Sequence, residues 1–360
     1  MLGEPKMKEK ILWAVIAFAA ASVFAYNPPA GGMNIFKLSS PTQLASAASS
    51  AGGGLFMPGP DAIACNPALT ALEQRSQLDA DFTALISTDA RDSHAFNAAF
   101  QTGILIPTKR FVASGFLNGV FCDSVNMDLA DSLAIHAALS KEISEHFSIG
   151  LGLNGGVLWG AHGDNDKDWS LGADVGVLYR RESLGFLKDF RLGGSLLNLG
   201  KYYKVDVVPI DKGKKADMFP SFVTVRTGVA SLLVDTNQFT LGFSFDISLP
   251  CFRDIAFDMG LQFSVKDTFF LSIAETIDVM EIKNSCLDVI PAVSLGVKFN
   301  LNAKNSEYLR SHSWDSSEML VSAAWQQKYE HIQAISAGAR IYLGQQDVQA
   351  PVIQLWTDED

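Results

Sequence analysis

Large apolar residues alternate with glycine, serine, aspartate or asparagine along several stretches of the chain. In the clearest stretch, every second position from Phe147 to Leu153 carries a large apolar side chain, and the positions between them carry serine or glycine. The same alternation returns over 169–179, 239–249 and 255–265. A period of two places all the apolar side chains of a strand on one side of it. Each stretch is therefore predicted to be a strand with one apolar face and one polar face.

About fourteen segments of this kind are separated by Gly, Pro, Asn and Asp, which punctuate strands. They run over 78–87, 94–106, 110–121, 132–141, 146–160, 169–180, 190–199, 219–230, 239–249, 255–265, 268–277, 289–300, 318–327 and 332–343. Segments of roughly ten residues can cross an outer membrane as tilted strands, and an even number of strands lets the first and last pair antiparallel. The predicted fold is all-β, a transmembrane antiparallel β-barrel of about fourteen strands over residues 78–344.

The first 25 residues are predicted to be a secretory signal peptide. Three lysines precede an apolar stretch over 11–21, and Val23 and Ala25 suit the −3 and −1 positions of a cleavage site. Cleavage is expected to leave Tyr26 at the start of the exported protein. A transmembrane anchor is the alternative, but the apolar run is shorter than the roughly twenty residues that a spanning helix needs.

Residues 26–77 have a different character, because they are rich in Ala, Gly, Ser and Pro and show no sustained alternation. Small residues let a segment pack closely inside another structure, so this stretch is predicted to be a hatch that fills the lumen. A disordered linker is the alternative, although Leu55, Phe56 and Ile63 make the stretch more apolar than linkers usually are. An acidic tail is expected over 345–360.

Charge and composition exclude several classes of function. The formal net charge is −11 and charged residues make up 19% of the chain, which disfavours a nucleic-acid partner because phosphate binding needs a basic face. The six histidines are scattered and no cysteine lies at ligand spacing, so neither a metal nor a cofactor is expected. Nothing in the sequence assembles a nucleophile, a base and an oxyanion donor, so we expect no enzyme activity.

The four cysteines are too few for a disulfide scaffold in an exported chain of this length. One pair is still a candidate disulfide. If odd-numbered strands run outward, Cys251 and Cys286 both lie in external connections, where oxidation is allowed. The bond requires their Cα atoms to come within about 7 Å of each other.

Two regions carry a resemblance to a known family. Residues 47–54 read Ala-Ala-Ser-Ser-Ala-Gly-Gly-Gly, and residues 60–69 end in Asn-Pro-Ala-Leu. This order resembles the N-terminal hatch of FadL-type long-chain fatty-acid outer-membrane channels, in which a Gly-rich stretch precedes an acidic, small-residue run ending in Asn-Pro-Ala. Residues 194–200, with Asn-Leu-Gly, and 219–229, with Phe-Pro and Arg-Thr-Gly, are similar to strands of FadL-like outer-membrane proteins, including spirochaetal paralogues.

The resemblance implies a fourteen-stranded barrel with the hatch inside it and a hydrophobic pathway from the cell surface into the outer membrane. It implies a hatch shaped by Gly52, Gly53, Gly54, Asn66, Pro67 and Ala68. It also implies a kink in the third strand that opens sideways into the bilayer, for which the candidates are Gly115, Asn118 and Gly119.

Together these features predict an outer-membrane channel for passive uptake of hydrophobic small molecules, with long-chain fatty acids as the expected ligand. Its partners would be that hydrophobic ligand and outer-membrane lipid, and a monomer is favoured. A structural or surface-interaction barrel without transport is the alternative, and a secreted soluble β-sandwich is a third possibility. The lumen separates the first two, because a hydrophobic channel needs an apolar pocket above the hatch, whereas a scaffold can be sealed by polar side chains.

Overall fold

A computed structural model covers most of the predicted barrel and part of the predicted hatch. It describes residues 38–45, 49–53, 56–87, 97–122, 131–159, 167–201, 203, 223–250, 252, 255–279, 282, 290–301, 317–328 and 332–344. The predicted signal peptide, Gly54, Cys251, Cys286 and the predicted acidic tail lie outside these residues. Among the described residues, no helix is long and apolar enough to span a membrane.

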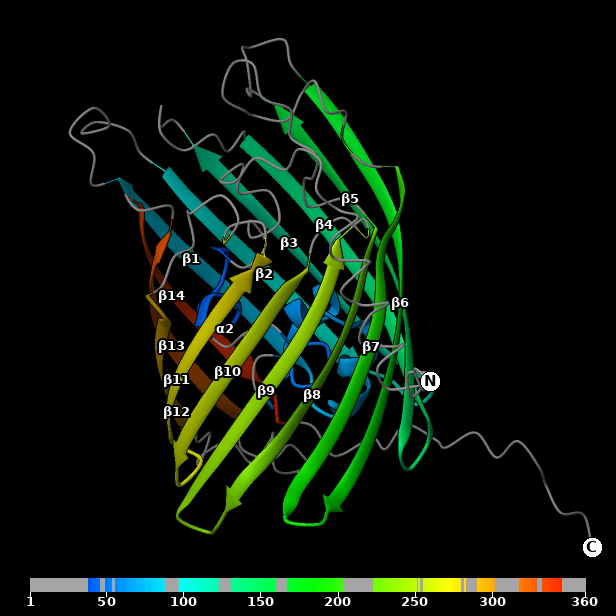
Figure 1. Ribbon diagram of the computed structural model, residues 1–360, viewed down its shortest axis with the longest axis vertical. Coiled ribbons are helices and arrows are strands. Elements are labelled where there is room, and N and C mark those ends of the chain that lie inside the picture. Colours follow the sequence, from blue (N-terminus) through cyan, green and yellow to red (C-terminus); the bar gives the residue numbers. More distant parts are fainter. Residues whose placement is uncertain are drawn as a thin grey trace, which may run out of the picture.

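Fourteen antiparallel strands of the described chain form a closed barrel (Figure 1). They are β1 (Gln77–Ser87), β2 (Asn97–Pro107), β3 (Val112–Cys122), β4 (Asp131–Ser144), β5 (Phe147–Trp159), β6 (Lys167–Leu184), β7 (Leu187–Lys201), β8 (Thr224–Asp235), β9 (Phe239–Pro250), β10 (Ala256–Val265), β11 (Phe269–Asp278), β12 (Ala292–Leu301), β13 (Ser317–Lys328) and β14 (Ile332–Tyr342). Each strand pairs with its neighbours in sequence, and β1 pairs with β14. The closed ring removes the free edges that lipid would not tolerate, and the predicted fold is confirmed.

The apolar face of the sheet points outward. In β5, Leu151 and Leu153 are 60% and 64% exposed, whereas Ser148 and Asn154 on the other face are buried. An outward apolar face and an inward polar face are the arrangement of a transmembrane barrel. The soluble β-sandwich is therefore wrong, because it would bury these leucines between two sheets.

The two ends of the barrel differ in the lengths of the connections between strands. Short turns such as 185–186 and 266–268 lie at the bottom of Figure 1, and we call this the short-turn end. Connections with more residues, such as 88–96 and 202–223, join strands at the opposite, long-loop end. Connections 302–316 and 329–331 are exceptions, because the topology places the first at the short-turn end and the second, of three residues, at the long-loop end. Transmembrane barrels have short periplasmic turns and longer external loops, so we expect the long-loop end to face outside.

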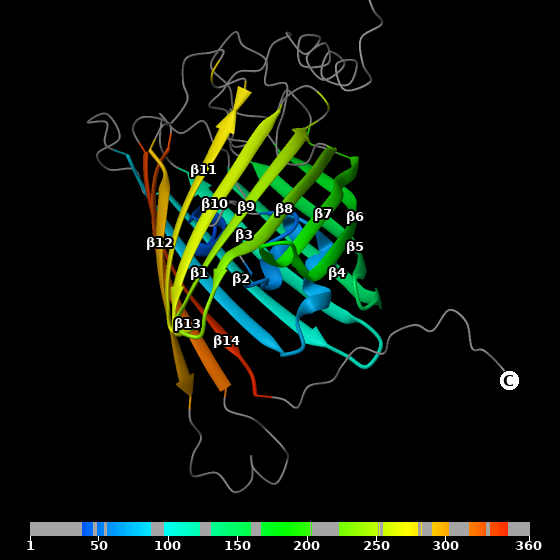
Figure 2. The same cartoon turned by 60° about the horizontal axis from the view of Figure 1, so that its bottom comes forward.

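The described residues before the first strand lie inside the barrel (Figure 2). Their elements are the helix α2 (Pro41–Ala45) and the 3-10 helices η2 (Pro60–Ala64) and η3 (Pro67–Leu72). α2 contacts β11 to β14, η2 contacts β1 to β4, and η3 contacts β3 to β6. We call residues 38–45, 49–53 and 56–72 the lumenal segment. It lies where the sequence predicts a hatch, whereas gating by it stays a prediction.

Only part of the lumenal segment packs on the wall through apolar contacts. Leu69 and its small neighbours pack on Leu178 of β6, while Ile63 packs on Phe116 of β3 and Ala138 of β4. These contacts involve η2, η3 and one side of the barrel. Polar contacts also attach the segment to the wall, and they form the candidate site described next.

Arginine placed in the middle of the outward face is expected to impair insertion into a membrane. Leu153 lies midway along β5, where arginine faces the lipid interior at a cost of about 2–4 kcal/mol. Phe269→Arg is the control, because Phe269 is also outward and 56% exposed but begins β11 beside a turn. Arginine near an interface costs only about 0–1 kcal/mol. The folded fraction in vesicles, read from gel mobility before and after heating, should fall much further for Leu153→Arg, and equal folding of the two variants would contradict the assignment.

Candidate functional site

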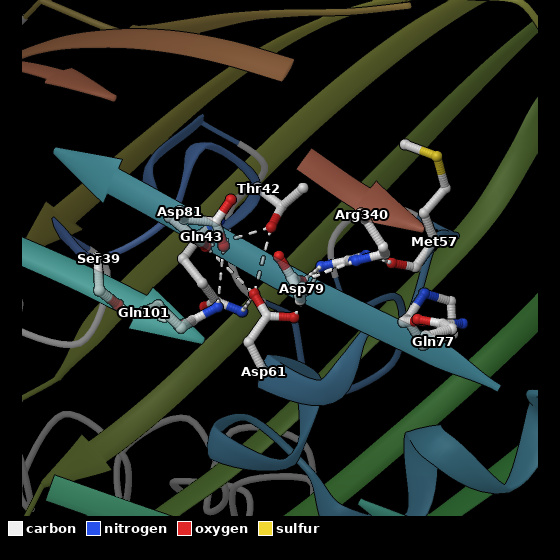
Figure 3. A network of polar contacts seen from close by, with 12 residues as sticks. Ser39, Thr42, Gln43, Met57, Asp61, Gln77, Asp79, Asp81, Gln101 and Arg340 are labelled. Carbon is white, nitrogen blue, oxygen red and sulfur yellow. Dashed lines mark hydrogen bonds and ion pairs between the residues drawn. The ribbon is translucent and has the colours of Figure 1, made fainter. Parts of the chain in front are cut away.

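A buried ion-pair network joins the lumenal segment to the first and last strands (Figure 3). Arg340 of β14 donates from Nε and Nη2 to Asp79 Oδ2 of β1 at 2.8 and 2.6 Å. The same Nη2 lies 3.1 Å from Asp61 Oδ1 in η2, and Nη1 donates to the carbonyl oxygen of Met57 at 3.0 Å. Arg340 is 3% exposed, and a buried charge is stable only when it is paired and hydrogen-bonded. One guanidinium therefore binds both the wall and the segment.

Asp61 also holds the lumenal segment together. Its Oδ2 accepts hydrogen bonds from Ser40 Oγ at 3.2 Å, Thr42 Oγ1 at 3.2 Å and Gln43 Nε2 at 2.9 Å. These donors lie in α2 or directly before it, and Figure 3 shows Thr42 and Gln43 turned toward the carboxylate of Asp61. One carboxylate oxygen thus faces Arg340 and the other fixes α2 beside η2.

A second ion-pair network holds the segment on the opposite strands. Arg226 of β8 donates from Nε to Asp246 Oδ2 of β9 at 2.8 Å and from Nη2 to Asp258 Oδ2 of β10 at 2.6 Å. Asp246 in turn accepts from Ser49 Oγ at 2.7 Å and from the backbone N–H of Ser50 at 2.6 Å. Asp246 and Asp258 lie directly opposite each other in the sheet, so Arg226 offsets a like-charge repulsion.

Asn66 provides a third attachment and also begins η3. Its Oδ1 accepts from the N–H of Ala68 at 2.9 Å, which caps the helix, and Pro67 occupies the first helical position, where no N–H is needed. Its Nδ2 donates to the carbonyl oxygen of Ser50 at 2.7 Å and to that of Val177 in β6 at 2.9 Å. Asn66 is fully buried. One side chain therefore fixes η3, the turn at Ser50 and the wall.

Glycines in the wall allow the segment to approach closely. An added Cβ at Gly176 of β6 would overlap Asn66 Oδ1, and one at Gly193 of β7 would overlap the carbonyl oxygen of Ser50. Gly150 of β5 faces the start of η3 in the same way. Glycine within a strand often marks such a close approach of another backbone. The inward small residues seen in the sequence thus match the space that the segment occupies.

The predicted hatch glycines form a turn next to β8. Reciprocal backbone hydrogen bonds join Ser49 and Gly53 at 2.9 and 3.1 Å, and Gly53 has φ 60°, a conformation that favours glycine. An added Cβ at Gly52 would lie 3.2 Å from Cβ of Ala230. Gly52 and Gly53 therefore lie inside the barrel together with Asn66, Pro67 and Ala68, whereas Gly54 is outside the described residues.

The predicted kink residues lie in a strand with regular pairing. β3 pairs with both β2 and β4 without a register shift. Gly115 and Gly119 alternate with inward residues, and an added Cβ at Gly119 would overlap the ring of Phe100. Asn118 faces the lumen, and its Oδ1 has no hydrogen-bond partner among the described residues. A lateral opening at these residues stays a prediction.

A bulge that sequence reasoning missed interrupts the pairing of β6 with β7. The register shifts between Ala173 and Val175, and Asn198 of β7 has φ 58°. The N–H of Asn198 donates to Asp174 Oδ1 at 2.6 Å, while Asn154 Nδ2 lies 3.0 and 2.8 Å from the two carboxylate oxygens. The bulge falls on the Asn-Leu-Gly motif. An aspartate in the middle of an inward strand face was the signal that could have revealed it.

Side chains that face the lumen are mostly polar. The buried polar wall residues include Asp79, Gln101, Asn154, Asp174, Asp246, Asp258, Gln262, Ser272 and Ser294. The described residues line two apolar pockets. One, of about 360 Å³, lies across β9, β10 and β11 beside Phe243 and Leu261. The other, of about 450 Å³, lies between Trp159 and Trp169 at the long-loop end. In the part of the chain that the structure describes, no group of His, Cys, Asp or Glu residues could hold a metal ion.

Comparison with known proteins finds similarity only at the level of structure. No family model matches the chain, and no curated protein matches its sequence. The CymD monoaromatic hydrocarbon channel is 10% identical with a TM-score of 0.49, and the match covers 87% of this chain and 98% of CymD. The Pseudomonas putida toluene transporter TodX is 9% identical with a TM-score of 0.46, covering 86% and 96%.

A Pseudomonas aeruginosa FadL homologue is 12% identical with a TM-score of 0.43, and the match covers 83% of this chain and 97% of the homologue. All three scores are below 0.5. The roles of individual residues therefore have to be inferred from this chain's own contacts.

Replacing Asn66 is expected to loosen the lumenal segment without opening the sheet. Asn66→Ala removes one cap and two donated hydrogen bonds, at a cost of about 1–3 kcal/mol. Cleavage of the segment by a protease added to the folded barrel should become roughly tenfold faster or more. Asn66→Ser keeps a capping hydroxyl but loses the bonds to Ser50 and Val177, so an intermediate rate is expected. Unchanged cleavage of both variants would show that Asn66 does not hold the segment.

Proposed function

We propose that this protein is an outer-membrane channel for passive uptake of hydrophobic small molecules, with the lumenal segment as its gate. The observation that carries the proposal is that the segment shares its ionic partners with the wall. Arg340 binds Asp79 of the wall as well as Asp61 of the segment, and Asp246 binds Arg226 of the wall as well as Ser49. The wall charges therefore stay paired when the segment moves, which lowers the cost of opening.

The proposed ligand is a long-chain fatty acid. This choice rests on the resemblance of residues 47–54 and 60–69 to the hatch of FadL-type channels. The outward apolar face supports a location in a membrane, and export through a cleaved signal peptide would deliver the chain to the outer membrane. No catalytic chemistry is proposed, because passive movement through a gated lumen needs none.

A reversible lock tests the gate. Gly52→Cys and Ala230→Cys would place two Cβ atoms about 3.2 Å apart, close to the roughly 3.5–4.5 Å of a disulfide. The pair is made in a background in which the four native cysteines are replaced. Saturable uptake of labelled oleate by vesicles should stop when the pair is oxidised and return when it is reduced. The same background without the new pair is the control, and its uptake should not respond to oxidation.

Two failures of this experiment are distinct. Uptake that continues through the oxidised barrel would mean that the segment is not the gate. No saturable uptake in any redox state would mean that the barrel does not transport oleate. The second result would favour a structural or surface-interaction barrel, an alternative that the polar lumen wall already supports.

A further inference from the structure

Arg191 differs from the two other buried arginines of the described wall in how few of its donors are used. Arg226 and Arg340 each bind two aspartates. Arg191 of β7 is 5% exposed, yet only its Nη2 is hydrogen-bonded, to Asp189 Oδ2 at 2.6 Å. Nε and Nη1 have no partner among the described residues, so three of the five guanidinium N–H bonds are unused. Unpaired buried donors are costly, which indicates a function or a missing partner.

The acidic side chains that interact with Arg191 also interact with other basic residues. Asp189 accepts from Arg191 and also from Arg180, whose Nε donates to Oδ1 at 2.8 Å. Glu73 also acts electrostatically on Arg191, as it does on Arg75 and Arg340. The basic groups at this place therefore share their acidic partners. An anion bound here would be attracted by the positive charge of Arg191 and would accept hydrogen bonds from its three unused N–H groups.

An aromatic ring of the lumenal segment covers Arg191. Its Cζ lies 5.0 Å from the ring centroid of Phe56. Phe56 has φ 67°, which is unfavourable for a residue other than glycine, and its ring fills the place of a side chain at Gly242 of β9. Because Phe56 belongs to the segment, movement of the segment would uncover the guanidinium.

We propose that Arg191 is an anion site on the short-turn side of the lumenal segment, and that it takes the carboxylate or phosphate headgroup of a single-chain amphiphile after Phe56 moves away. The inference rests on the proposed function and adds the headgroup charge of the ligand to it. Arg191 lies near the start of β7, beside the turn 185–186. A ligand that has passed the segment on its way to the short-turn end would meet it there.

Binding of three probes with one chain and different headgroups tests this site. The full-length protein, refolded in detergent, is titrated with labelled oleate, oleyl phosphate and oleyl alcohol. Arg191→Gln should weaken binding of the anions roughly ten- to hundredfold and leave oleyl alcohol nearly unchanged. Arg180→Gln is the matched control, because it removes the same charge from the same Asp189 but its side chain is 47% exposed. Its effect on the anions should stay within about twofold.

Phe56→Ala provides a second measurement that keeps Arg191. It removes the cover, so oleate affinity should rise several-fold. If Arg191→Gln weakens the binding of oleate alone, the site takes a carboxylate. If it weakens the binding of oleyl phosphate alone, the site takes a phosphate. Equal effects of Arg191→Gln on all three probes, or unchanged oleate affinity in Phe56→Ala, would overturn the site while leaving the channel intact. If the wild-type barrel binds none of the probes, the proposed function fails together with the site.

Discussion

Deleting residues 27–71 is expected to turn the barrel into a leaky pore for small hydrophilic solutes without unfolding it. The first strand begins at Gln77, so the deletion removes no hydrogen bond between strands. The buried arginines keep wall partners, since Arg340 retains Asp79 and Arg226 retains Asp246 and Asp258. The deletion therefore removes the lumenal segment but keeps the paired strands of the barrel.

The size of the leak follows from the strand count. A barrel of about eight strands is filled by its own side chains, whereas one of about sixteen to eighteen leaves an aqueous channel. Fourteen strands with many glycines and serines on the inner face leave a lumen in which the segment lies. Its removal should expose a polar, wet passage.

Liposome swelling with small sugars measures the leak, and oleate uptake by the same vesicles measures the proposed transport. The deletion should raise swelling strongly and abolish saturable oleate uptake. Asp61→Asn is the control. It weakens one attachment of the lumenal segment but leaves the segment in the barrel, so only slight swelling is expected. A deletion variant that folds but swells no faster than the wild type would refute the view that the segment closes the lumen.

The barrel could be predicted because its signal repeats along the chain. Leu151 and Leu153 lie on the outward face that the alternation assigned to them, and the first strand was predicted at 78–87 and found at Gln77–Ser87. Each strand carries the same local pattern, so an error in the predicted end of one strand does not change the predicted number of strands. The side chains that face outward could also be predicted without knowing which strands are neighbours.

The polar attachments could not be predicted, because they depend on register across the closed sheet. Asp79 and Arg340 are directly paired residues of β1 and β14, and they meet only when the barrel closes. Asp246 and Asp258 face each other only in one register of β9 and β10. A one-residue slip would turn either aspartate toward lipid. Charged residues at inward positions in the middle of strands were visible in the sequence, but their partners were not.

The lumen also shows where a family resemblance reaches its limit. Asn66 and Pro67 were singled out by motif alone, and the structure gives them a cap, a first helical position and contacts with the wall. The same resemblance implies a kink at Gly115, Asn118 and Gly119, where β3 is regularly paired. Local motifs can mark a helix start, whereas a break in a strand depends on both neighbouring strands.

Arg340→Leu is expected to be the most destabilising single substitution in the lumen. It would leave the carboxylates of Asp61 and Asp79 buried without their cation. Removing one partner of a buried ion pair typically costs about 3–5 kcal/mol. The free energy of unfolding by urea, measured in lipid vesicles, should fall by about that amount.

Arg75→Leu is the matched control for this prediction. Arg75 makes the same kind of contact, to Glu318 at 2.8 Å, but its side chain is 30% exposed, so its loss should cost only about 0–1 kcal/mol. The same pair of substitutions in the barrel that lacks residues 27–71 separates the two roles of Arg340. Without Asp61 one buried carboxylate fewer is left uncompensated, so the cost of Arg340→Leu should shrink while that of Arg75→Leu stays the same. An unchanged cost of Arg340→Leu would mean that the guanidinium stabilises the wall alone and does not hold the segment.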